Sequence, residues 1–272
     1  MTQRKSMSAA QQHGEGEGFS LRWQRPRLPA APEGPEVWGH HQDGAGGRYR
    51  VQEATADLHE ALLRFYAAEF FHDEPVSRDL GLAADEVSAA EYSFMAAASL
   101  RQGASLVVLE ERPEGAALAA EPEIVGGMIL PVLSIHEELP EMQGRVVRIM
   151  MGLNLALRGS GPHCDPLAPT RTPPLQHYAC DLGLWVRRDR RGRGLGSAIL
   201  AAVPTVCATL GIPHFSTLFT SAQSQRLATK AGFKELTRLP YADVMDEEGR
   251  PAFSAQMPET HCALMGTDID IK

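Results

Sequence analysis

The stretch from residue 177 to residue 203 constrains the fold of this chain more than any other part of the sequence. It begins with HYACDLGLWV (177–186), a largely apolar run typical of a buried strand. The polar, glycine-punctuated turn RRDRRGRG follows, and GLGSAILAAV then begins a helix. We therefore expect an α/β protein in which a buried strand leads through a glycine-rich turn into a helix.

The turn itself has the features that bind a pyrophosphate. The first amides of a helix lack partners inside the helix and carry partial positive charge. Glycines let the backbone approach an anion closely and adopt positive φ. Arg190, Arg191 and Arg193 add positive charge, and Arg187 and Arg188 lie within reach of phosphates or solvent.

The spacing of the glycines separates the possible phosphate loops. A Walker A loop needs Gly-Lys-Ser/Thr, which the turn lacks, and a dinucleotide fingerprint needs a third glycine where Ser197 stands. The remaining spacing is Arg191-x-x-Gly194-x-Gly196 after a strand that ends at Val186. The alternative without a ligand is an arginine-rich surface turn.

This spacing resembles motif A of the GNAT N-acetyltransferases. The resemblance implies a mixed α/β GNAT fold, in which helices flank a central mixed sheet whose middle strands splay apart. It also implies acetyl-CoA as cosubstrate, with its pyrophosphate on the turn and its pantetheine arm along the strand before it. The residues that it assigns to the coenzyme are Leu184, Trp185, Val186, Arg191, Gly192, Arg193, Gly194, Leu195, Gly196 and Ser197. Motif B should follow, and LFTSAQSQRLATKAGF (218–233) is similar to it.

Periodicity predicts the remaining elements. The expected strands are 49–54, 105–111, 124–134, 177–186, 214–220, 241–245 and 261–264. The expected helices are 55–73, 141–157, one beginning near residue 194, and one over 224–233 closed by Gly232. Strands 105–111 and 124–134 are expected to pair through a hairpin-like connection, and Pro204 to kink or shorten its helix. Residues 1–47 show no period and are interpreted as a flexible extension, which leaves 48–272 as the acetyltransferase domain.

Three further segments resemble one GNAT branch, the insect-type arylalkylamine N-acetyltransferases. FFHDEP (70–75) is similar to the end of that family's first helix, and TSAQSQRLATKAGFKE is similar to its motif B. The tail YADVMDEEGRPAF…HCALM is similar to its closing strands. The resemblance implies transfer of an acetyl group to a small primary amine such as dopamine, serotonin, tyramine or tryptamine.

The resemblance also assigns the proton acceptor. An arylalkylamine is an ammonium ion at neutral pH and must lose a proton before it attacks the thioester. In the resembled family the glutamate of Asp-Glu-Pro has that role, which falls on Glu74 here, with Asp73 as second candidate. Burial beside Phe70 and Phe71 would raise the pKa of this acid toward the working range. The alternative is a solvated acid at a helix end.

The leaving thiolate needs a hydrogen-bond donor or a proton. Many GNAT enzymes use a tyrosine four residues before the glycine of motif B, but Ala228 stands at that position. The resembled family uses serines at the start of this helix, which makes Ser221 and Ser224 the candidates. Helix capping by Ser221 is the structural alternative.

Composition limits the other possibilities. The net charge of −8 argues against nucleic acid as partner and is compatible with a cationic substrate. The four cysteines form no C-x-x-C pair, so no metal is expected. The N-terminus lacks the apolar region of a signal peptide and no apolar run is long enough to span a bilayer, so a cytoplasmic location is the expectation. The sequence does not fix the oligomeric state.

Two alternatives to an arylalkylamine acetyltransferase stay open. The acceptor can instead be a polyamine, an amino acid or a protein amine. Since the motif B tyrosine is absent, a non-catalytic module that binds acetyl-CoA is also compatible with the sequence.

Overall fold

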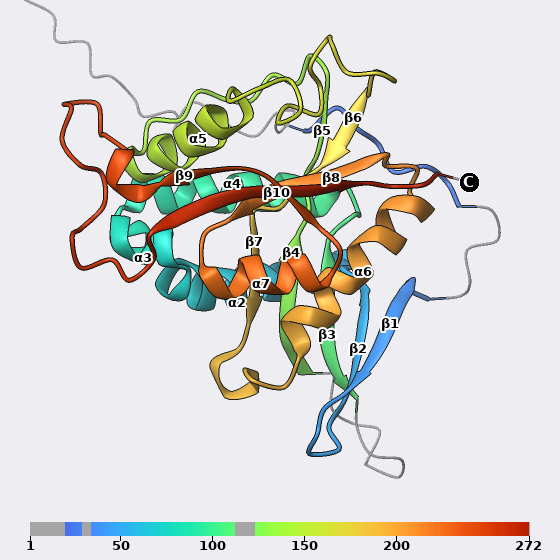
Figure 1. Cartoon of the computed structure of the whole chain (residues 1–272). Coiled ribbons are helices and arrows are strands. Elements are labelled where there is room, and N and C mark those ends of the chain that lie inside the picture. The colour runs from blue at the N-terminus through green and yellow to red at the C-terminus, as the bar shows by residue number, and fades with distance from the viewer. Residues whose placement is uncertain (1–19, 29–33, 112–122, 272) are drawn as a thin grey trace, which may run out of the picture.

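Two five-stranded sheets form the centre of the molecule (Figure 1). They are seen in a computed structural model that describes residues 20–28, 34–111 and 123–271. The first sheet contains, in spatial order, β1 (Val37–Gln42), β2 (Arg48–Glu53), β3 (Leu106–Glu111), β4 (Glu123–Ile129) and β7 (Gly183–Val186). The second contains β5 (Val132–Ser134), β6 (His177–Ala179), β8 (His214–Phe219), β10 (His261–Asp268) and β9 (Lys234–Pro240).

Helices cover both faces of each sheet. They are α2 (His59–Asp73), α3 (Pro75–Leu80), α4 (Glu86–Arg101), α5 (Arg145–Arg158), α6 (Leu195–Thr209) and α7 (Ala222–Lys230). Helix α6 contacts β1–β4 and β7 from one face of the first sheet, and α2 and α4 contact β4 from the other. Helix α5 packs on β9 and β10, with α7 also against β8, β9 and β10 (Figure 1). Short 3₁₀ turns complete the order at Ala56–Leu58, Leu82–Ala84, Arg188–Arg190 and Tyr241–Asp243.

The two sheets are joined by one long antiparallel strand pair. Residues 123–134 run beside residues 177–186, so β4 pairs with β7 and β5 pairs with β6. Both segments are interrupted at the same level. At this level, Cys180 N donates to Pro131 O and Leu182 N donates to Ile129 O. Beyond this break β6 pairs in parallel with β8 through Ala179 and Phe215, whereas β7 continues in the other sheet. Strands β7 and β8 therefore diverge, and we call the opening between them the fork.

Two buried apolar clusters hold the layers together. One cluster contains Tyr66, Phe70 and Leu100 from α2 and α4, and the other contains Ile199 and Val203 from α6. Strand β3 contributes to both because its first four residues are buried on both faces. Burial of this kind is the main source of stability in an α/β fold. It also fixes the position of β7, whose Trp185 packs on Phe65 with ring centroids 6.0 Å apart.

Most predicted elements are confirmed, and several are corrected. The helix expected over 55–73 is present from residue 56, and strands 105–111 and 124–134 pair antiparallel as predicted, although their connection lies outside the described residues. The single strands predicted for 124–134 and 177–186 are each divided between the two sheets. The strand predicted at 241–245 is wrong, because residues 241–243 form a 3₁₀ turn and the strand β9 ends just before it.

The segment before residue 48 also contains a strand. The absence of any period before residue 48 predicted no strand there, but β1 pairs antiparallel with β2 at the edge of the first sheet. Leu21 and Trp23 are buried as well. Backbone pairing with β2 supplies the stability that a weak sequence pattern does not show. The interpretation of residues 1–19 and 29–33 as flexible lies outside the described residues.

Helix α6 continues through Pro204 to Thr209 and is not shortened there. Proline removes one intrahelical hydrogen bond, but seven side chains of this helix are buried between the sheets. The packing of the buried face therefore outweighs the lost bond. Among the described residues, no helix has both the length and the apolar character needed to cross a membrane.

Candidate active site

The strand that leads into the glycine turn has one edge without a strand partner. Strand β7 pairs with β4 along Gly183–Val186, and no described strand pairs with its other edge. The carbonyl of Val186 accepts a hydrogen bond from Arg191 Nε at 2.9 Å, so this carbonyl faces away from β4. An extended ligand on this edge would meet backbone donors and acceptors, as in strand addition to a sheet.

The turn presents the beginning of α6 at the end of this edge. Gly194 is the N-cap residue with φ 84° and ψ 2°, and Gly192 also has positive φ, at 75°. No described side chain caps the helix, and intrahelical bonding begins with Ala198 N donating to Gly194 O at 3.1 Å. The amides of residues 195–197 lie in the first turn, where a helix binds anions.

The two glycines of the motif differ in whether the structure could accommodate a side chain in their place. The left-handed backbone of Gly194 is one that other residues rarely adopt, and a Cβ there would also lie 3.0 Å from the His41 ring. A Cβ at Gly196 would lie 3.4 Å from Leu227 Cδ1, which is an ordinary contact. Gly194 is therefore required by the turn, whereas the packing of α6 on α7 leaves room for a Cβ at Gly196.

Arginines of the turn are held by carboxylates of α2. Arg191 Nη2 lies 2.6 Å from Asp73 Oδ2 and 3.3 Å from Glu69 Oε2. Arg188 also pairs with Asp73, its Nε donating at 2.8 Å. These two guanidiniums lower the pKa of Asp73 to about 2, Arg188 having the larger effect. Asp73 is therefore a permanently charged anchor of the turn and a poor proton acceptor at neutral pH.

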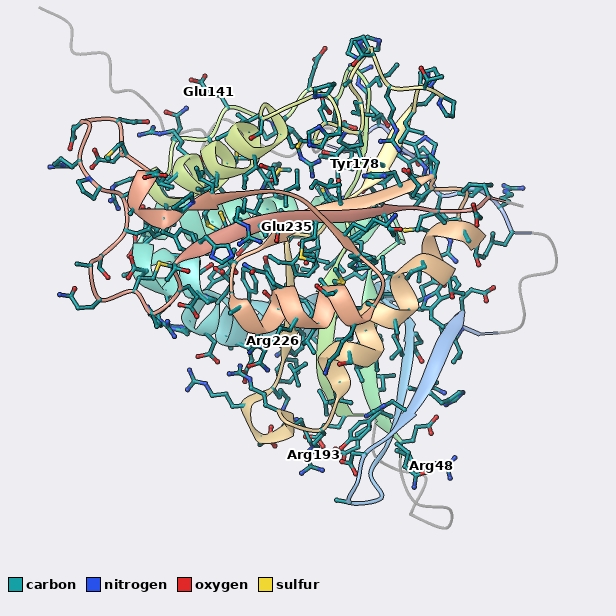
Figure 2. All side chains as sticks on the ribbon, in the orientation of Figure 1. Arg48, Glu141, Tyr178, Arg193, Arg226 and Glu235 are labelled. Carbon is teal, nitrogen blue, oxygen red and sulfur yellow. The ribbon has the colours of Figure 1, made fainter. Side chains whose placement is uncertain are left out.

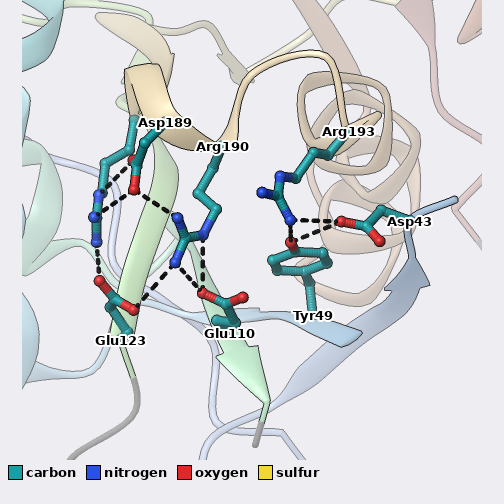
Figure 3. A network of polar contacts seen from close by, with 8 residues as sticks. Asp43, Tyr49, Glu110, Glu123, Asp189, Arg190 and Arg193 are labelled. Atoms are coloured by element: carbon teal, nitrogen blue, oxygen red, sulfur yellow. Dashed lines mark hydrogen bonds and ion pairs between the residues drawn. The ribbon is translucent and has the colours of Figure 1, made fainter. Parts of the chain in front are cut away.

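The other side of the turn is held by the first sheet (Figure 3). Arg193 Nη1 donates to Asp43 Oδ2 at 3.0 Å and to the Tyr49 hydroxyl at 3.2 Å. The ring of His41 bonds the carbonyl of Arg193 at 2.6 Å. Arg193 accordingly lies at the same end of the molecule as Arg48 of the β1–β2 hairpin (Figure 2). The hairpin thus fixes the backbone next to Gly194.

Arg190 completes this arrangement by bonding Glu110 of β3 at 2.8 Å, and Arg187 pairs with Glu123 and Asp189. All five arginines of the turn therefore contact carboxylates in the described structure. The sequence predicted their positive charge but not these partners, which apart from Asp189 come from four distant segments. The unpaired positive potential at the turn is consequently that of the helix amides more than that of the side chains.

Glu74 lies between α2 and α3, and its charge acts on Asp181, which lies between β6 and β7. It is the N-cap of α3, and its two carboxylate oxygens accept from Val76 N at 3.0 Å and from Ser77 N at 2.6 Å. The proline at 75 begins α3 and ends α2 at Asp73. Glu74 is half-buried, whereas the adjacent His72 is exposed, as expected. The capping bonds fix the carboxylate in place and leave further lone pairs on both oxygens.

Ser221 and Ser224 lie at the beginning of α7, directly after β8. They form a reciprocal capping box, in which Ser221 Oγ accepts from Ser224 N at 3.1 Å and Ser224 Oγ accepts from Ser221 N at 3.2 Å. Their two hydroxyls are 3.0 Å apart. Capping is therefore one role of both serines, and it places a pair of hydroxyls on the β8 side of the fork.

Tyr241 connects the two sides. Its hydroxyl donates to the carbonyl of Thr220 at 2.8 Å, next to Ser221. Burial raises its pKa far above the usual value, and the charge of Glu74 contributes to the same shift. Glu74 and the serine pair therefore both lie near one buried tyrosine.

A further acid, which the sequence did not single out, lies at the base of the fork. Asp181 interrupts the strand between β6 and β7, and Thr217 Oγ1 of β8 donates to its carboxylate at 2.6 Å. Burial raises the pKa of Asp181 to about 7, Thr217 acting in the opposite direction and the charge of Glu74 in the same direction. A signal was present, because Asp181 is the one charged residue of the apolar run 177–186.

Tyrosines from two helices fix the backbone beside Asp181. The hydroxyls of Tyr66 and Tyr92 both donate to the carbonyl of Leu182, at 2.5 and 2.9 Å. With Phe70 and Phe71 they form a buried aromatic stack behind the fork. These aromatic residues are core residues that shape the fork. Within the described residues, no group of acids, histidines and cysteines is arranged to hold a metal ion.

The sequence of the turn and motif B region matches a known family. Residues 168–233 match the model of the acetyltransferase (GNAT) family. A strand with a free edge, a glycine turn and an uncapped helix are the features of this region, and they lie within the mixed α/β fold described above. Residues 168–233 are therefore similar to the GNAT family, and the fold around them is the mixed α/β GNAT fold.

Solved structures of similar fold include several insect proteins. The fold is similar to that of a protein of the yellow fever mosquito Aedes aegypti described as arylalkylamine N-acetyltransferase 7, with 26% sequence identity and a TM-score of 0.77. The match covers 92% of this chain and 100% of the mosquito protein. Arylalkylamine N-acetyltransferase 2 of Aedes aegypti is similar in fold at 17% identity, with a TM-score of 0.67 over 82% of this chain and 99% of its own.

A third protein of similar fold is described with a different substrate. The Drosophila melanogaster polyamine N-acetyltransferase, which catalyses the formation of N-acetylagmatine, has a TM-score of 0.56 at 18% identity. That match covers 81% of this chain and all of the Drosophila chain. No curated protein matches the sequence.

Proposed function

We propose that this chain transfers the acetyl group of acetyl-CoA to a small primary amine, an arylalkylamine, by direct transfer within a ternary complex. The observation that carries the proposal is the free edge of β7, which runs from the fork to the uncapped beginning of α6. A pyrophosphate on the amides of residues 195–197 and a pantetheine arm along Leu184–Val186 would bring the thioester to the fork.

The coenzyme set proposed from the sequence fits this geometry. Gly192 and Gly194 give the turn its shape, and the backbone of Leu195, Gly196 and Ser197 supplies the donors. Leu184, Trp185 and Val186 form the strand edge, while Arg191 and Arg193 brace the turn and lie beside the proposed phosphate position.

The chemistry of the transfer needs a base at the fork. We propose Glu74 for this role, because two backbone amides hold its carboxylate in place and its charge reaches Asp181 at the base of the fork. Ser221 and Ser224, at the start of α7 directly after β8, would stabilise the departing thiolate by a hydrogen bond. A thiol with an ordinary pKa of about 8.5 leaves without a strong general acid.

The identity of the acceptor rests on the relatives. Two similar structures are named arylalkylamine N-acetyltransferases and one acetylates agmatine, so a polyamine is the second candidate. A release assay for CoA thiol with tyramine, tryptamine, dopamine, histamine, spermidine and agmatine separates them. We expect the highest kcat/KM with an arylalkylamine. If only the polyamines are acetylated, the acceptor is a polyamine and not an arylalkylamine. Tight coenzyme binding with no turnover would indicate a non-catalytic module.

The coenzyme site has a separate test with a matched control. Gly194→Val places a β-branched residue at φ 84°, and Gly211→Val does the same at φ 70°, beyond the far end of α6. Each substitution introduces similar backbone strain, about 1–2 kcal/mol. We expect acetyl-CoA affinity, measured by calorimetry, to fall at least about tenfold in Gly194→Val and to stay unchanged in Gly211→Val. Equal affinity in the two variants would overturn the proposed coenzyme site.

A further inference from the structure

A pocket of about 270 Å³ lies between the end of helix α2 and the 3₁₀ turn that follows α3, and we call it the α3 pocket. Its wall comes from residues 71–84 and includes neither Glu74 nor any residue of the glycine turn, of β7 or of the serine pair. The α3 pocket is therefore separate from the proposed coenzyme site. Its lining includes Phe71, His72, Ser77, Arg78, Ala83 and Ala84.

Much of the wall of the α3 pocket is hydrocarbon. Phe71, Ala83 and Ala84 contribute apolar surface to it. Gly81 ends α3 with φ 77° and leads the chain directly into the turn that carries the two alanines. An apolar cavity of about 150 Å³ is enough to hold benzene. The α3 pocket therefore has room for an aromatic ring that bears a small substituent.

Ser77 adds a hydroxyl group without a partner to this wall. The residue is fully buried, and its Oγ has no hydrogen-bond partner among the described residues. Buried hydroxyl groups in folded proteins are normally hydrogen-bonded, because leaving them unpaired is costly. The backbone amide of Ser77 is engaged, since it donates to Glu74 Oε2 at 2.6 Å. The hydroxyl is therefore the group through which Ser77 can bond a ligand.

The charged side chains of the lining are cationic or can become so. Arg78 and His72 are exposed, and their side chains form no hydrogen bond or ion pair with any residue in the described part of the chain. Exposed cations alone are ordinary on a protein surface. These two differ because they line a hollow that also contains an unsatisfied hydroxyl group.

The acids of the same segment do not neutralise these cations, because each has another partner. The carboxylate of Asp73 pairs with arginines of the glycine turn, and that of Glu74 caps α3. Asp79 Oδ2 accepts a hydrogen bond from Ser254 N at 2.8 Å, which ties α3 to the loop before β10. The α3 pocket thus carries positive charge at its wall in a chain whose net charge is −8.

We propose that the α3 pocket is a binding site for a small aromatic carboxylate. The planar guanidinium of Arg78 matches a carboxylate group and can form two parallel hydrogen bonds with it. A ring nitrogen of His72 and the hydroxyl of Ser77 are further donors, and the aromatic ring would pack against Phe71 and the alanines. This inference does not depend on the proposed acetyltransferase function.

Benzoate is the probe, and calorimetry on the full chain without coenzyme or amine measures its binding. We expect a Kd of about 1 mM or tighter. Benzamide has the same shape without the charge and should bind at least about tenfold more weakly. In NMR spectra, benzoate should shift the amide signals of residues 71–84.

Two variants test the polar groups, and each leaves the backbone contacts of Glu74 in place. Arg78→Gln should weaken benzoate binding at least about tenfold, because it removes the charged donor. Ser77→Ala should weaken it about three- to tenfold, the usual effect of one hydrogen bond. Arg64→Gln changes an exposed arginine of α2 outside the pocket and is the matched control, which should bind benzoate like the wild type.

A third variant tests the hollow itself. Ala84 is exposed, so Ala84→Trp fills the pocket from its solvent side without changing a charge or a buried residue, and it should abolish benzoate binding. Equal benzoate affinity in the wild type, Arg78→Gln and Ala84→Trp would overturn the inference. Loss of benzoate binding in Gly194→Val, with binding kept in Arg78→Gln, would place the anion on the glycine turn and would overturn it as well.

Discussion

Gly183, at the start of β7, shows how one missing side chain shapes the fork. A Cβ at this position would lie 2.5 Å from Phe70 Cε2. Phe70 is buried and stacks on Tyr66, with ring centroids 4.9 Å apart, and Tyr66 bonds the carbonyl of Leu182. A methyl group at residue 183 would therefore push an aromatic layer that has no free space and also anchors the backbone beside Asp181.

We expect Gly183→Ala to lower the free energy of unfolding by about 1–3 kcal/mol, the usual effect of overpacking a core. Gly152→Ala is the matched control, since Gly152 lies in helix α5 and a Cβ added there would have nothing within 4 Å. Alanine there should raise the free energy of unfolding by roughly 0.5–1 kcal/mol. Urea denaturation measures both, and effects of the same sign would contradict the packing argument.

At the scale of elements, α4 supplies the caps of α5. The N-cap of α5 is Gly144, which has no side chain to accept hydrogen bonds. Ser88 Oγ on α4 accepts from Val146 N at 3.0 Å and from Val147 N at 3.3 Å, while Glu91 accepts from Gly144 N at 2.9 Å. The two helices are thus joined by the groups that a helix start leaves unsatisfied.

Ser88→Ala should therefore destabilise the protein. The variant leaves two buried amides without an acceptor, and we expect the free energy of unfolding to fall by about 1–3 kcal/mol. Ser88→Thr retains the hydroxyl, but Ser88 is fully buried, so Ser160→Ala is the better control for loss of an exposed hydroxyl. Hydrogen exchange of Val146 and Val147 should rise in Ser88→Ala alone, and unchanged exchange there would argue against the cap.

Local pattern predicted those elements whose stability is local. Helices α2 and α7 and strands β3 and β8 follow clear apolar periods and turn residues. Helix α4 was not predicted because buried alanine, serine and aromatic residues spread around it and leave no single apolar face. Strand β9 was not predicted because it is a polar edge strand that pairs only with β10, so its partner determines its conformation.

The candidate site also has parts that local sequence predicts and parts that it does not. The glycine turn and its helix were predictable because the residues that shape them are neighbours in the chain. The pairing of Arg193 with Asp43 joins residues 150 positions apart, and that of Asp181 with Thr217 depends on how two sheets diverge. Such contacts follow from tertiary packing and leave only a weak trace in the sequence, such as a single acid in an apolar strand.

At the scale of the whole molecule, acids act on stability in opposite directions. The pKa of Asp73 is lowered to about 2 by Arg188 and Arg191. A carboxyl group with a lowered pKa stabilises the folded state above its ordinary pKa of 3.8, and this contribution is lost as the pH falls from 3.8 toward 2. The anchor between α2 and the glycine turn should therefore weaken only in strong acid.

The contribution of Asp181 to stability changes with pH in the opposite direction to that of Asp73. Its pKa is about 7 in the folded protein and 3.8 in the unfolded chain, so the unfolded chain releases this proton first as the pH rises. The folded state accordingly loses stability between pH 3.8 and about 7, with no further change above that range. A shift of this size corresponds to at most about 4 kcal/mol, and the partial exposure of Asp181 reduces the effect. We expect Asp181→Asn to match the wild type in stability near pH 4 and to exceed it by about 1–3 kcal/mol at pH 8. Urea denaturation across this range measures the difference, with Glu141→Gln as the control that should show none. A difference that does not change with pH would mean that the folded protein does not raise the pKa of Asp181.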